Sequence, residues 1–379
     1  MSSEPRLLVL TPDFPPAPGG IQLLVARIVQ HVERLRPRVL TVGGPGTHEY
    51  DAAHDLDVRR VRGQQRRAIA ALNAVALAQA ARFRPAVVLS AHIVTAPAAA
   101  VIRAALRVPV VQYLYAEELG NRPALTAFAL RRADGAVAIS RYTHELALKA
   151  GADAARVQLI PPGVDIPDQP LTQARATRPT LLTVARIGER YKGHDVVLRA
   201  LPLIRARVPD VEWVVIGDGP LRPGLERAAR DQGLQDAVRF LGRVCDAERD
   251  RWLARAHLFT MPSRVPGGRF AGEGFGIVYL EAGAHGLPVV AGSEGGAVDA
   301  VVHGETGLLV DPTNHVAVAE AIADLLIDRD RARRFGTAGA RRAREFAWPV
   351  VAHRVEDLVL GLLDGSLARG PRSAGRRTT

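Results

Sequence analysis

The chain has 379 residues, more than one ordinary hydrophobic core accommodates, so we expect about two domains. Its single cysteine, Cys245, excludes a disulfide framework, and no apolar run of 18 residues predicts a transmembrane helix. Lysine and arginine number 50 against 39 aspartates and glutamates, which gives a formal net charge of +11. This charge favours a phosphorylated substrate or an anionic membrane. The zinc spacings and aromatic series of nucleic-acid binders are missing, so we expect no nucleic-acid partner.

Strands and helices alternate through the first part of the chain. The apolar run near the N-terminus predicts a strand rather than a signal peptide. Strands are predicted at 6–12, 38–44, 86–92, 108–115 and 135–140, and helices at 19–35, 66–83 and 141–151. Repeated β–α units predict an open parallel sheet covered on both faces, and we expect this N-terminal domain to span residues 1–165.

The same alternation resumes after a polar, proline-rich linker predicted at 166–179. Strands are predicted at 180–186, 212–220, 238–244, 257–263, 287–292 and 307–312. A second domain is therefore expected over 180–345, followed by a helix over 346–365 and a disordered basic tail over 366–379. The predicted fold class is α/β, with two Rossmann-like parallel-sheet domains facing each other across a cleft.

Polar residues at the carboxyl ends of the strands are the first site candidates, because ligands of open parallel sheets bind beyond those ends. Arg186 and Lys192 flank a glycine-containing loop after the strand 180–186. An arginine fork and a lysine point charge together suit a diphosphate. Two solvated surface cations are the alternative interpretation.

Two further strand ends carry candidates. Gly19 and Gly20 open the helix 19–35, where glycines let backbone N–H groups approach an anion, although a simple turn fits as well. His92 ends the strand 86–92, where it can hydrogen-bond a substrate. A histidine packed in the core is the alternative.

The stretch EGFGIVYLEA places Glu273 and Glu281 eight residues apart. A helix is predicted to begin near Phe275 or Gly276. Helical side chains lean toward the N-terminus, so both carboxylates can reach one ligand. Paired hydroxyls of a ribose or a hexose suit such carboxylates. The alternatives are a helix cap with a surface glutamate, or the acid and nucleophile of a glycosidase.

Several segments together resemble one enzyme family. EGFGIVYLEAGAHGLPVVAG is similar to the E-x7-E motif of retaining GT-B glycosyltransferases of family 4, the group 1 class. The family order and spacing are also kept by PPAPGGIQ, AVAISRYTHELALKAG, IPPGVD, VARIGERYKGHD, VVIGDGP, VRFLGRV, MPSR and GSEGGAVDAVVHGETGLLVDP. The resemblance covers nearly the whole chain. It implies transfer of a hexose from a nucleoside-diphosphate sugar to an acceptor hydroxyl, with retention and without a metal or other cofactor.

The resemblance also implies roles for the matching positions. By this resemblance the catalytic residues would be His92, Arg186, Lys192 and Glu273. The donor-binding residues would be Gly19, Gly20, Arg186, Lys192, Val244, Asp246, Glu273, Gly274, Phe275, Gly276, Ile277 and Glu281. Within this set, Val244 and Asp246 would hold the nucleobase and Glu281 the ribose. The leaving phosphate would accept the acceptor proton in a front-face attack, and domain closure would exclude water.

The chain departs from the family pattern in two places. Many relatives carry HG-x-E where this chain has YAEEL (115–119), and Tyr115 and Glu118 therefore indicate a different acceptor side. The segment 264–274 lengthens the loop before Glu273, which predicts either a substrate lid or a plain surface loop.

Donor and acceptor are less strongly encoded. Asp246 suits the N1–H and N2–H groups of guanine, which favours GDP-mannose, with UDP-hexoses and UDP-N-acetylhexosamines close behind. The segment 59–67 carries five arginines before an apolar helix, which suits an anionic membrane and a lipid-linked acceptor. A solvated helix face, with a polysaccharide or small-molecule acceptor, fits equally well. We expect a cytoplasmic protein that can sit at the inner face of the cell membrane. A GT-B sugar-nucleotide epimerase and an inactive GT-B binding protein are the rival functions.

Overall fold

The protein folds into two compact units in a computed structural model that describes residues 4–63, 65–167, 175–266 and 272–366. The first unit comprises residues 1–161 together with 348–379, and the second comprises residues 162–347. Three sequence predictions fall partly outside the described residues. These are the linker at 168–174, the long loop at 267–271 and the tail at 367–379.

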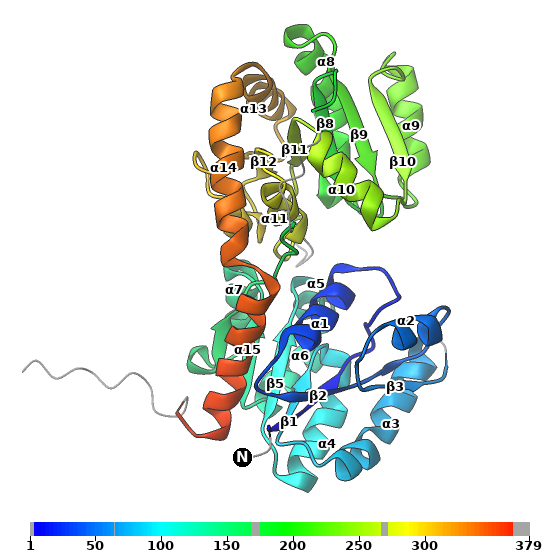
Figure 1. Cartoon of the computed structure of the whole chain (residues 1–379), viewed down its shortest axis with the longest axis vertical. Coiled ribbons are helices and arrows are strands. Elements are labelled where there is room, and N and C mark those ends of the chain that lie inside the picture. Colours follow the sequence, from blue (N-terminus) through cyan, green and yellow to red (C-terminus); the bar gives the residue numbers. More distant parts are fainter. Residues whose placement is uncertain (1–3, 64, 168–174, 267–271, 367–379) are drawn as a thin grey trace, which may run out of the picture. The chain divides into compact units, whose positions relative to one another are not determined.

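A seven-stranded sheet forms the centre of the first unit (Figure 1). Its order is β3-β2-β1-β4-β5-β6-β7, and all neighbouring strands are parallel. The strands are β1 (Arg6–Leu10), β2 (Arg36–Val42), β3 (Val58–Val61), β4 (Val87–Ser90), β5 (Val110–Leu114), β6 (Gly135–Ala138) and β7 (Val157–Leu159). The chain leaves β1 toward one edge and β4 toward the other. The switch point, where such sheets bind ligands, therefore lies between these two strands.

Helices from both ends of the chain complete the first unit. They are α1 (Gly20–His31), α2 (Thr47–Ala53), α3 (Gln65–Phe83), α4 (Ala96–Leu106), α5 (Ala116–Asn121), α6 (Pro123–Arg132), α7 (Arg141–Lys149) and α15 (Trp348–Leu363), with 3-10 turns η1 (Ile93–Thr95) and η2 (Ala154–Arg156). The α15 helix packs on α1. Its Glu356 is 1% exposed and accepts hydrogen bonds from the backbone N–H groups of Glu33 and Arg34 at 2.7 and 2.6 Å. These bonds fix the chain just after α1.

The second unit repeats the plan with six parallel strands. The order is β10-β9-β8-β11-β12-β13, which places the switch point between β8 and β11. The strands are β8 (Thr180–Val184), β9 (Glu212–Ile216), β10 (Val238–Gly242), β11 (Leu258–Met261), β12 (Val289–Gly292) and β13 (Gly307–Val310). The helices are α8 (His194–Arg207), α9 (Arg222–Asp231), α10 (Asp246–Arg255), α11 (Ile277–Ala284), α12 (Ala297–Ala300), α13 (His315–Ile327) and α14 (Arg329–Glu345), with the 3-10 turn η3 (Arg190–Lys192).

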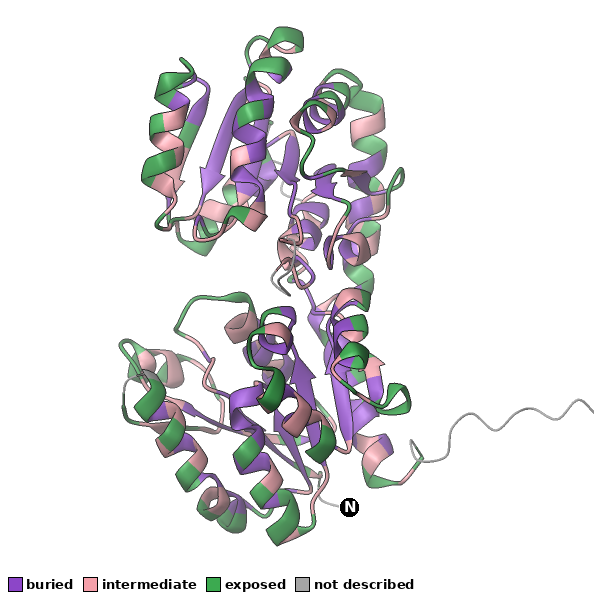
Figure 2. Cartoon of the chain, turned by 180° about the vertical axis from the view of Figure 1, so that it is seen from behind, coloured by how far each residue is buried: buried purple, intermediate pink, exposed green. Residues whose placement is uncertain are grey.

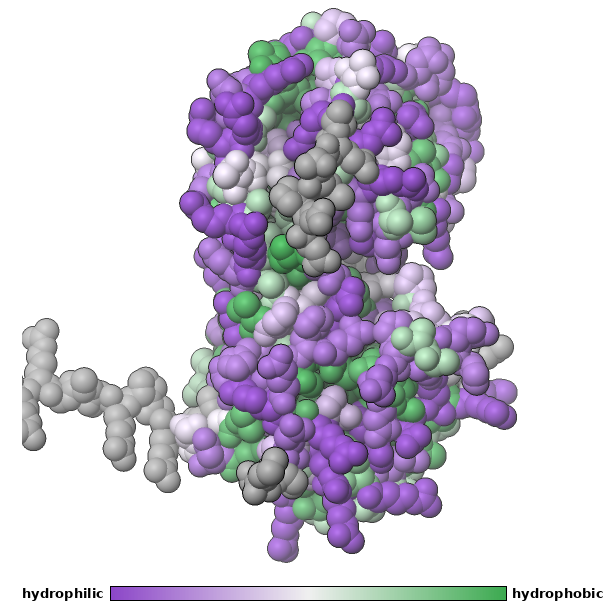
Figure 3. Space-filling view, viewed as in Figure 1, coloured by the Kyte–Doolittle hydropathy of each residue, from purple (hydrophilic) through white to green (hydrophobic). Residues whose placement is uncertain are grey.

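Burial follows the pattern that parallel sheets require. Figure 2 shows buried strands in both units and helices whose outer faces are exposed. In β1 the residues Leu7, Leu8, Val9 and Leu10 are all 0% exposed, which is why the strand reads as a continuous apolar run. Hydrophilic side chains cover most of the face that Figure 3 shows. None of the described helices is long and apolar enough to cross a bilayer.

The α/β class and the strand alternation predicted from the sequence are confirmed, whereas several element limits were wrong. The helix predicted to reach residue 35 ends at His31, because the chain bends to let Glu356 take its N–H groups. The final helix begins at Trp348 rather than residue 346. Sequence reasoning missed β3 and β7, which are only four and three residues long.

Candidate functional site

The loop after β8 carries the two predicted cations of the second unit. Lys192 lies in η3, and Gly193 follows it with φ +81° at the start of α8. A Cβ on Gly193 would stand 2.3 Å from the carbonyl oxygen of Pro262, which follows β11. The backbone N–H of Arg264 also donates to the carbonyl of Tyr191 at 2.9 Å. The loops on both sides of the switch point are therefore packed against each other.

Lys192 and Glu273 are brought into direct contact across 81 residues of sequence. The Nζ atom lies 2.5 Å from Oε2, and the two side chains are 14% and 12% exposed. Burial disfavours the ammonium, but the Glu273 carboxylate outweighs burial, so the pKa of Lys192 lies above its ordinary value. Lys192 is thus a fixed, charged ammonium at the end of the sheet.

Arg186 is held much more loosely than Lys192. Its side chain is 67% exposed, and it forms an ion pair with Glu189 at 3.7 Å. The guanidinium can therefore swing toward a ligand at little cost, since exposed ion pairs of this kind are weak. The predicted pair of cations consists of one buried, pre-positioned charge and one mobile charge.

The glycine-rich loop that precedes α11 holds Glu273 through its backbone. The N–H of Gly296 donates to the Glu273 carbonyl at 2.7 Å. Gly276, with φ +87°, ends the loop, and Ile277 is the first residue of α11, close to the predicted start. Phe275 is 2% exposed and packs against Phe346. Its side chain is a core anchor, which leaves the backbone of Gly274 to Gly276 as the part able to meet a ligand.

Glu281 lies on α11 next to a residue that the sequence analysis missed. Burial raises the pKa of the Glu281 carboxyl, and the nearby charge of Arg249 opposes that rise. Arg249, on α10, donates to Asp246 at 2.9 Å and to Asp250 at 3.0 Å. The spacing of Asp246 and Arg249, three apart at a helix start after a strand, could have signalled this arginine. Val244 lies just before the same helix and is partly exposed.

The corresponding strand ends of the first unit carry the glycine pair. Gly19 precedes α1 and provides no side-chain cap for it. A Cβ on Gly19 would lie 2.1 Å from Oε1 of Gln22. The position therefore leaves room for Gln22, whose Nε2 donates to Asp13 at 2.9 Å, whereas Gly20 has open space around it. Asp13, which sequence reasoning also missed, follows β1.

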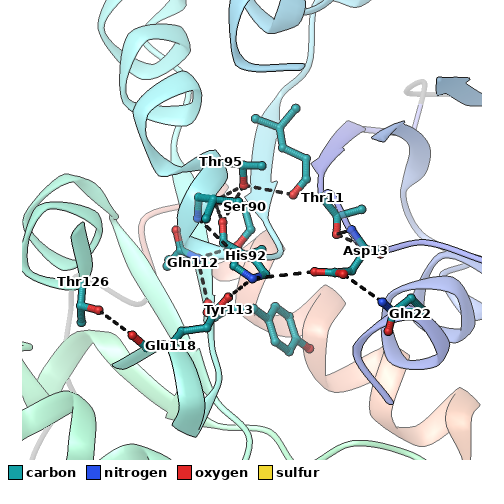
Figure 4. Close-up of polar contacts among 12 residues, drawn as sticks. Thr11, Asp13, Gln22, Ser90, His92, Thr95, Gln112, Tyr113, Glu118 and Thr126 are labelled. Carbon is teal, nitrogen blue, oxygen red and sulfur yellow. Dashed lines mark hydrogen bonds and ion pairs between the residues drawn. The ribbon is translucent and has the colours of Figure 1, made fainter. Parts of the chain in front are cut away.

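His92 follows β4 and lies between two carboxylates (Figure 4). Its Nε2 is 2.5 Å from Oε1 of Glu118 and 3.8 Å from Oδ2 of Asp13. Burial raises the pKa of both carboxyls, and the His92 ring opposes the rise in each. Glu118 thus belongs to the same cluster as His92, although the sequence comparison treated it as part of a changed acceptor side.

The basic segment 59–67 is not the uniform patch that the sequence suggested. Arg60 is only 11% exposed, and its guanidinium donates to both oxygens of Asp51, at 2.7 Å each, and to the carbonyls of Pro15 and Val42. Arg59 pairs with Asp57 at 3.4 Å. Arg62, Arg66 and Arg67 are exposed. Part of the charge therefore anchors the loop that leads to Gly19.

Two parallel-sheet units of this strand order have the GT-B fold. The structure is similar to that of sucrose-phosphate synthase from Thermosynechococcus elongatus, with a TM-score of 0.79 and 20% identity over 95% of this chain and 100% of the other. It is also similar to Anabaena HepE in complex with UDP and glucose, with a TM-score of 0.78 and 21% identity over 94% and 100%.

The chain belongs to the glycosyl transferases group 1, family 4. The model "Glycosyl transferases group 1" matches residues 168–342, and "Glycosyltransferase Family 4" matches residues 18–167. A GDP-mannose-dependent alpha-(1-6)-phosphatidylinositol monomannoside mannosyltransferase of Mycobacterium tuberculosis is 34% identical over 94% of this chain and 98% of its own. A GDP-mannose-dependent monoacylated alpha-(1-6)-phosphatidylinositol monomannoside mannosyltransferase of Corynebacterium glutamicum is 30% identical over 95% and 99%. The protein is therefore a retaining hexosyltransferase, as its motifs predicted.

Proposed function

We propose that this enzyme transfers mannose from GDP-mannose, with retention, to a hydroxyl of a phosphatidylinositol mannoside. The observation that carries the transferase chemistry is the contact between Lys192 and Glu273, with mobile Arg186 on the same loop. The donor and acceptor classes are supported by the two relatives, whose names give them and which align over nearly the whole chain.

The proposed chemistry follows from where charge develops. As the bond to the sugar breaks, negative charge grows on the leaving diphosphate, and a pre-positioned ammonium stabilises it without reorganisation. Lys192 supplies that charge, and Arg186 closes on the phosphate oxygens as a fork. Glu273 both orients Lys192 and leaves its second oxygen for a hydroxyl of the sugar. His92 is assigned to the reacting sugar from the first unit.

Guanine is the nucleobase that we assign to the region around Val244 and Asp246. The Asp246 side chain is 87% exposed even while Arg249 contacts one of its oxygens. A carboxylate presented in this way can accept from N1–H and N2–H of guanine, and uracil lacks that pair of adjacent donors. Glu281, which Arg249 partly neutralises, is assigned to the ribose hydroxyls.

We further propose that turnover needs no metal ion, because Lys192 and Arg186 supply the positive charge that the leaving group requires. Among the described residues no group of three histidine, cysteine, aspartate or glutamate side chains could hold a metal. The measurement is the initial rate after dialysis against EDTA, which should be unchanged. A rate that falls and returns with added magnesium would contradict this part of the proposal.

A peripheral position at the inner face of the cell membrane is also proposed. The exposed arginines Arg66 and Arg67, at the start of α3, would meet anionic lipid at about 1 kcal/mol each. Their double change to glutamate should weaken sedimentation with phosphatidylinositol-containing vesicles. The matched control is Arg227→Glu with Arg230→Glu, which removes the same charge from the exposed side of α9. Equal binding by the two variants would argue against this surface.

The first test is a panel of GDP- and UDP-sugars offered to the enzyme with and without a mannosylated phosphatidylinositol acceptor. Wild type should consume GDP-mannose alone, and Lys192→Met and Glu281→Ala should each lower kcat/KM by about 10²-fold or more. Lys149→Met is the matched control, because it changes the only other lysine of the chain, which is exposed on α7. Consumption of a UDP-sugar instead would show that GDP-mannose is not the donor. Binding of a nucleotide sugar without turnover would favour an inactive binding protein.

A further inference from the structure

The tautomer of His92 follows from its neighbours. The backbone N–H of Val94 donates to Nδ1 at 3.1 Å, so Nδ1 must present a lone pair. The ring proton of the neutral imidazole is therefore on Nε2, which points at Glu118 and, more distantly, at Asp13 (Figure 4). Both ring nitrogens therefore have partners within the first unit.

Glu118 is the buried side of this cluster. Its side chain is 7% exposed, and it sits on α5, whose N-terminus follows β5. A carboxylate this buried is costly unless a partner compensates it, and Nε2 of His92 lies 2.5 Å from its Oε1. Its role is to accept from the imidazole and hold the ring in place.

Asp13 is the solvent-accessible carboxylate of this cluster. Its side chain is 26% exposed, and Oδ1 accepts from Gln22 at 2.9 Å. Its backbone is fixed in a turn, because its N–H donates to Oγ1 of Thr11 at 3.0 Å and that hydroxyl donates to its carbonyl at 2.9 Å. The loop then runs to Gly19. A carboxylate accepts about four hydrogen bonds, so Asp13 retains capacity for a ligand hydroxyl.

We infer that Glu118, His92 and Asp13 act as one unit, in which Glu118 positions His92 and Asp13 is the residue that accepts a hydrogen bond from a sugar or polyol hydroxyl of the substrates. The ligand class rests on the proposed function. The cluster itself lies at the switch point between β1 and β4, where the fold places ligands. A donor sugar and an acceptor both carry such hydroxyls, and the kinetics separate the two sources.

The tautomer is tested on the wild-type protein by ¹⁵N NMR of labelled histidines, with His92 assigned by comparison with His92→Gln. We expect the ring proton on Nε2 and none on Nδ1, because Nδ1 accepts from the N–H of Val94. A proton on Nδ1 would overturn the inference. This result does not depend on any substrate, so it is independent of the donor and acceptor proposed above.

The role of Asp13 is tested by Asp13→Asn, which keeps the shape but removes the charge. A hydrogen bond to a charged group predicts a KM increase of about tenfold to a hundredfold, with the His92 tautomer unchanged. If KM already rises for donor hydrolysis in the absence of acceptor, the hydroxyl belongs to the donor. If KM rises only in the transfer reaction, the hydroxyl belongs to the acceptor. Both KM values within twofold of wild type would refute the role.

The positioning role of Glu118 is tested by a pair of substitutions. In Glu118→Gln the amide oxygen still accepts from Nε2–H, so kcat should fall by less than about tenfold, whereas Glu118→Ala should lose far more at a similar KM. Glu117→Gln, at the exposed neighbouring position, is the control. Equal activity in Glu118→Gln and Glu118→Ala would refute positioning through a hydrogen bond. Failure of wild type to turn over any nucleotide sugar would instead refute the proposed function.

Discussion

Replacing Gly296 by alanine should disable the donor loop through a purely steric effect. Gly296 has φ −77°, a conformation that any residue adopts, so the substitution introduces no backbone strain. The added Cβ would lie 2.1 Å from the carbonyl oxygen of Gly274, 2.4 Å from its carbon and 2.6 Å from Cα of Phe275. All three atoms belong to the backbone, which cannot rotate away as a flexible side chain would.

The size of the effect follows from these distances. Restoring an ordinary contact of 3.4 Å requires the loop or α12 to move by about 1.3 Å. Overpacking of this kind costs about 1–3 kcal/mol, which lowers Tm by roughly 2–12 °C for a unit of this size. A displacement of about 1 Å at a reacting group costs on the order of 10²-fold in rate. We therefore expect kcat/KM to fall far more than the loss of stability explains.

The assay compares donor turnover and thermal unfolding in Gly296→Ala and Gly224→Ala. Gly224 lies on α9 of the same unit, and a Cβ there meets no heavy atom within 4 Å. The control should keep full activity and a similar or slightly higher Tm. Gly296→Ala with kcat/KM within twofold of wild type would show that the loop tolerates the movement, and the steric reasoning would be wrong.

Two further predictions concern stability. Glu356→Ala should lower the free energy of unfolding by about 3 kcal/mol in urea titration, because it leaves two backbone N–H groups and Arg34 without their carboxylate. The control Asp357→Ala removes an exposed partner of the same arginine and should cost under about 1 kcal/mol. Equal losses in the two variants would contradict the burial argument. Burial, with help from Lys192, lowers the pKa of His194 to about 4 from the ordinary value of 6.5. Between pH 4 and 6.5 the unfolded chain therefore binds more protons than the folded protein. About 3 kcal/mol of stability should be lost as the pH falls from 6.5 to 4. His194→Gln should flatten that part of the pH dependence, and an identical profile would refute it.

The sequence placed its candidate site residues at strand ends, but it did not identify their partners. Lys192 and Glu273 could be found because each stands in a short motif at the end of a strand, where the parallel sheet dictates a ligand site. Their contact spans 81 residues and depends on the packing of the loops after β8 and β11, which local periodicity does not encode. The electrostatic effect of Arg249 on Glu281 was missed for the same reason. Each needs the strand order before it can be predicted.

The basic segment 59–67 shows why a run of charge in a sequence is not yet a charged surface. Alternation along β3 turns Arg60 inward, where it meets Asp51 and the carbonyl of Pro15, while Arg59 pairs with Asp57. The guanidinium of Arg60 also lies 5.6 Å from the ring of Phe14, just before the glycine loop. Arg60 thus holds the backbone that leads to Asp13 and Gly19. Any attraction to an anionic surface must therefore be counted from the exposed arginines alone, and it is smaller than five arginines would suggest.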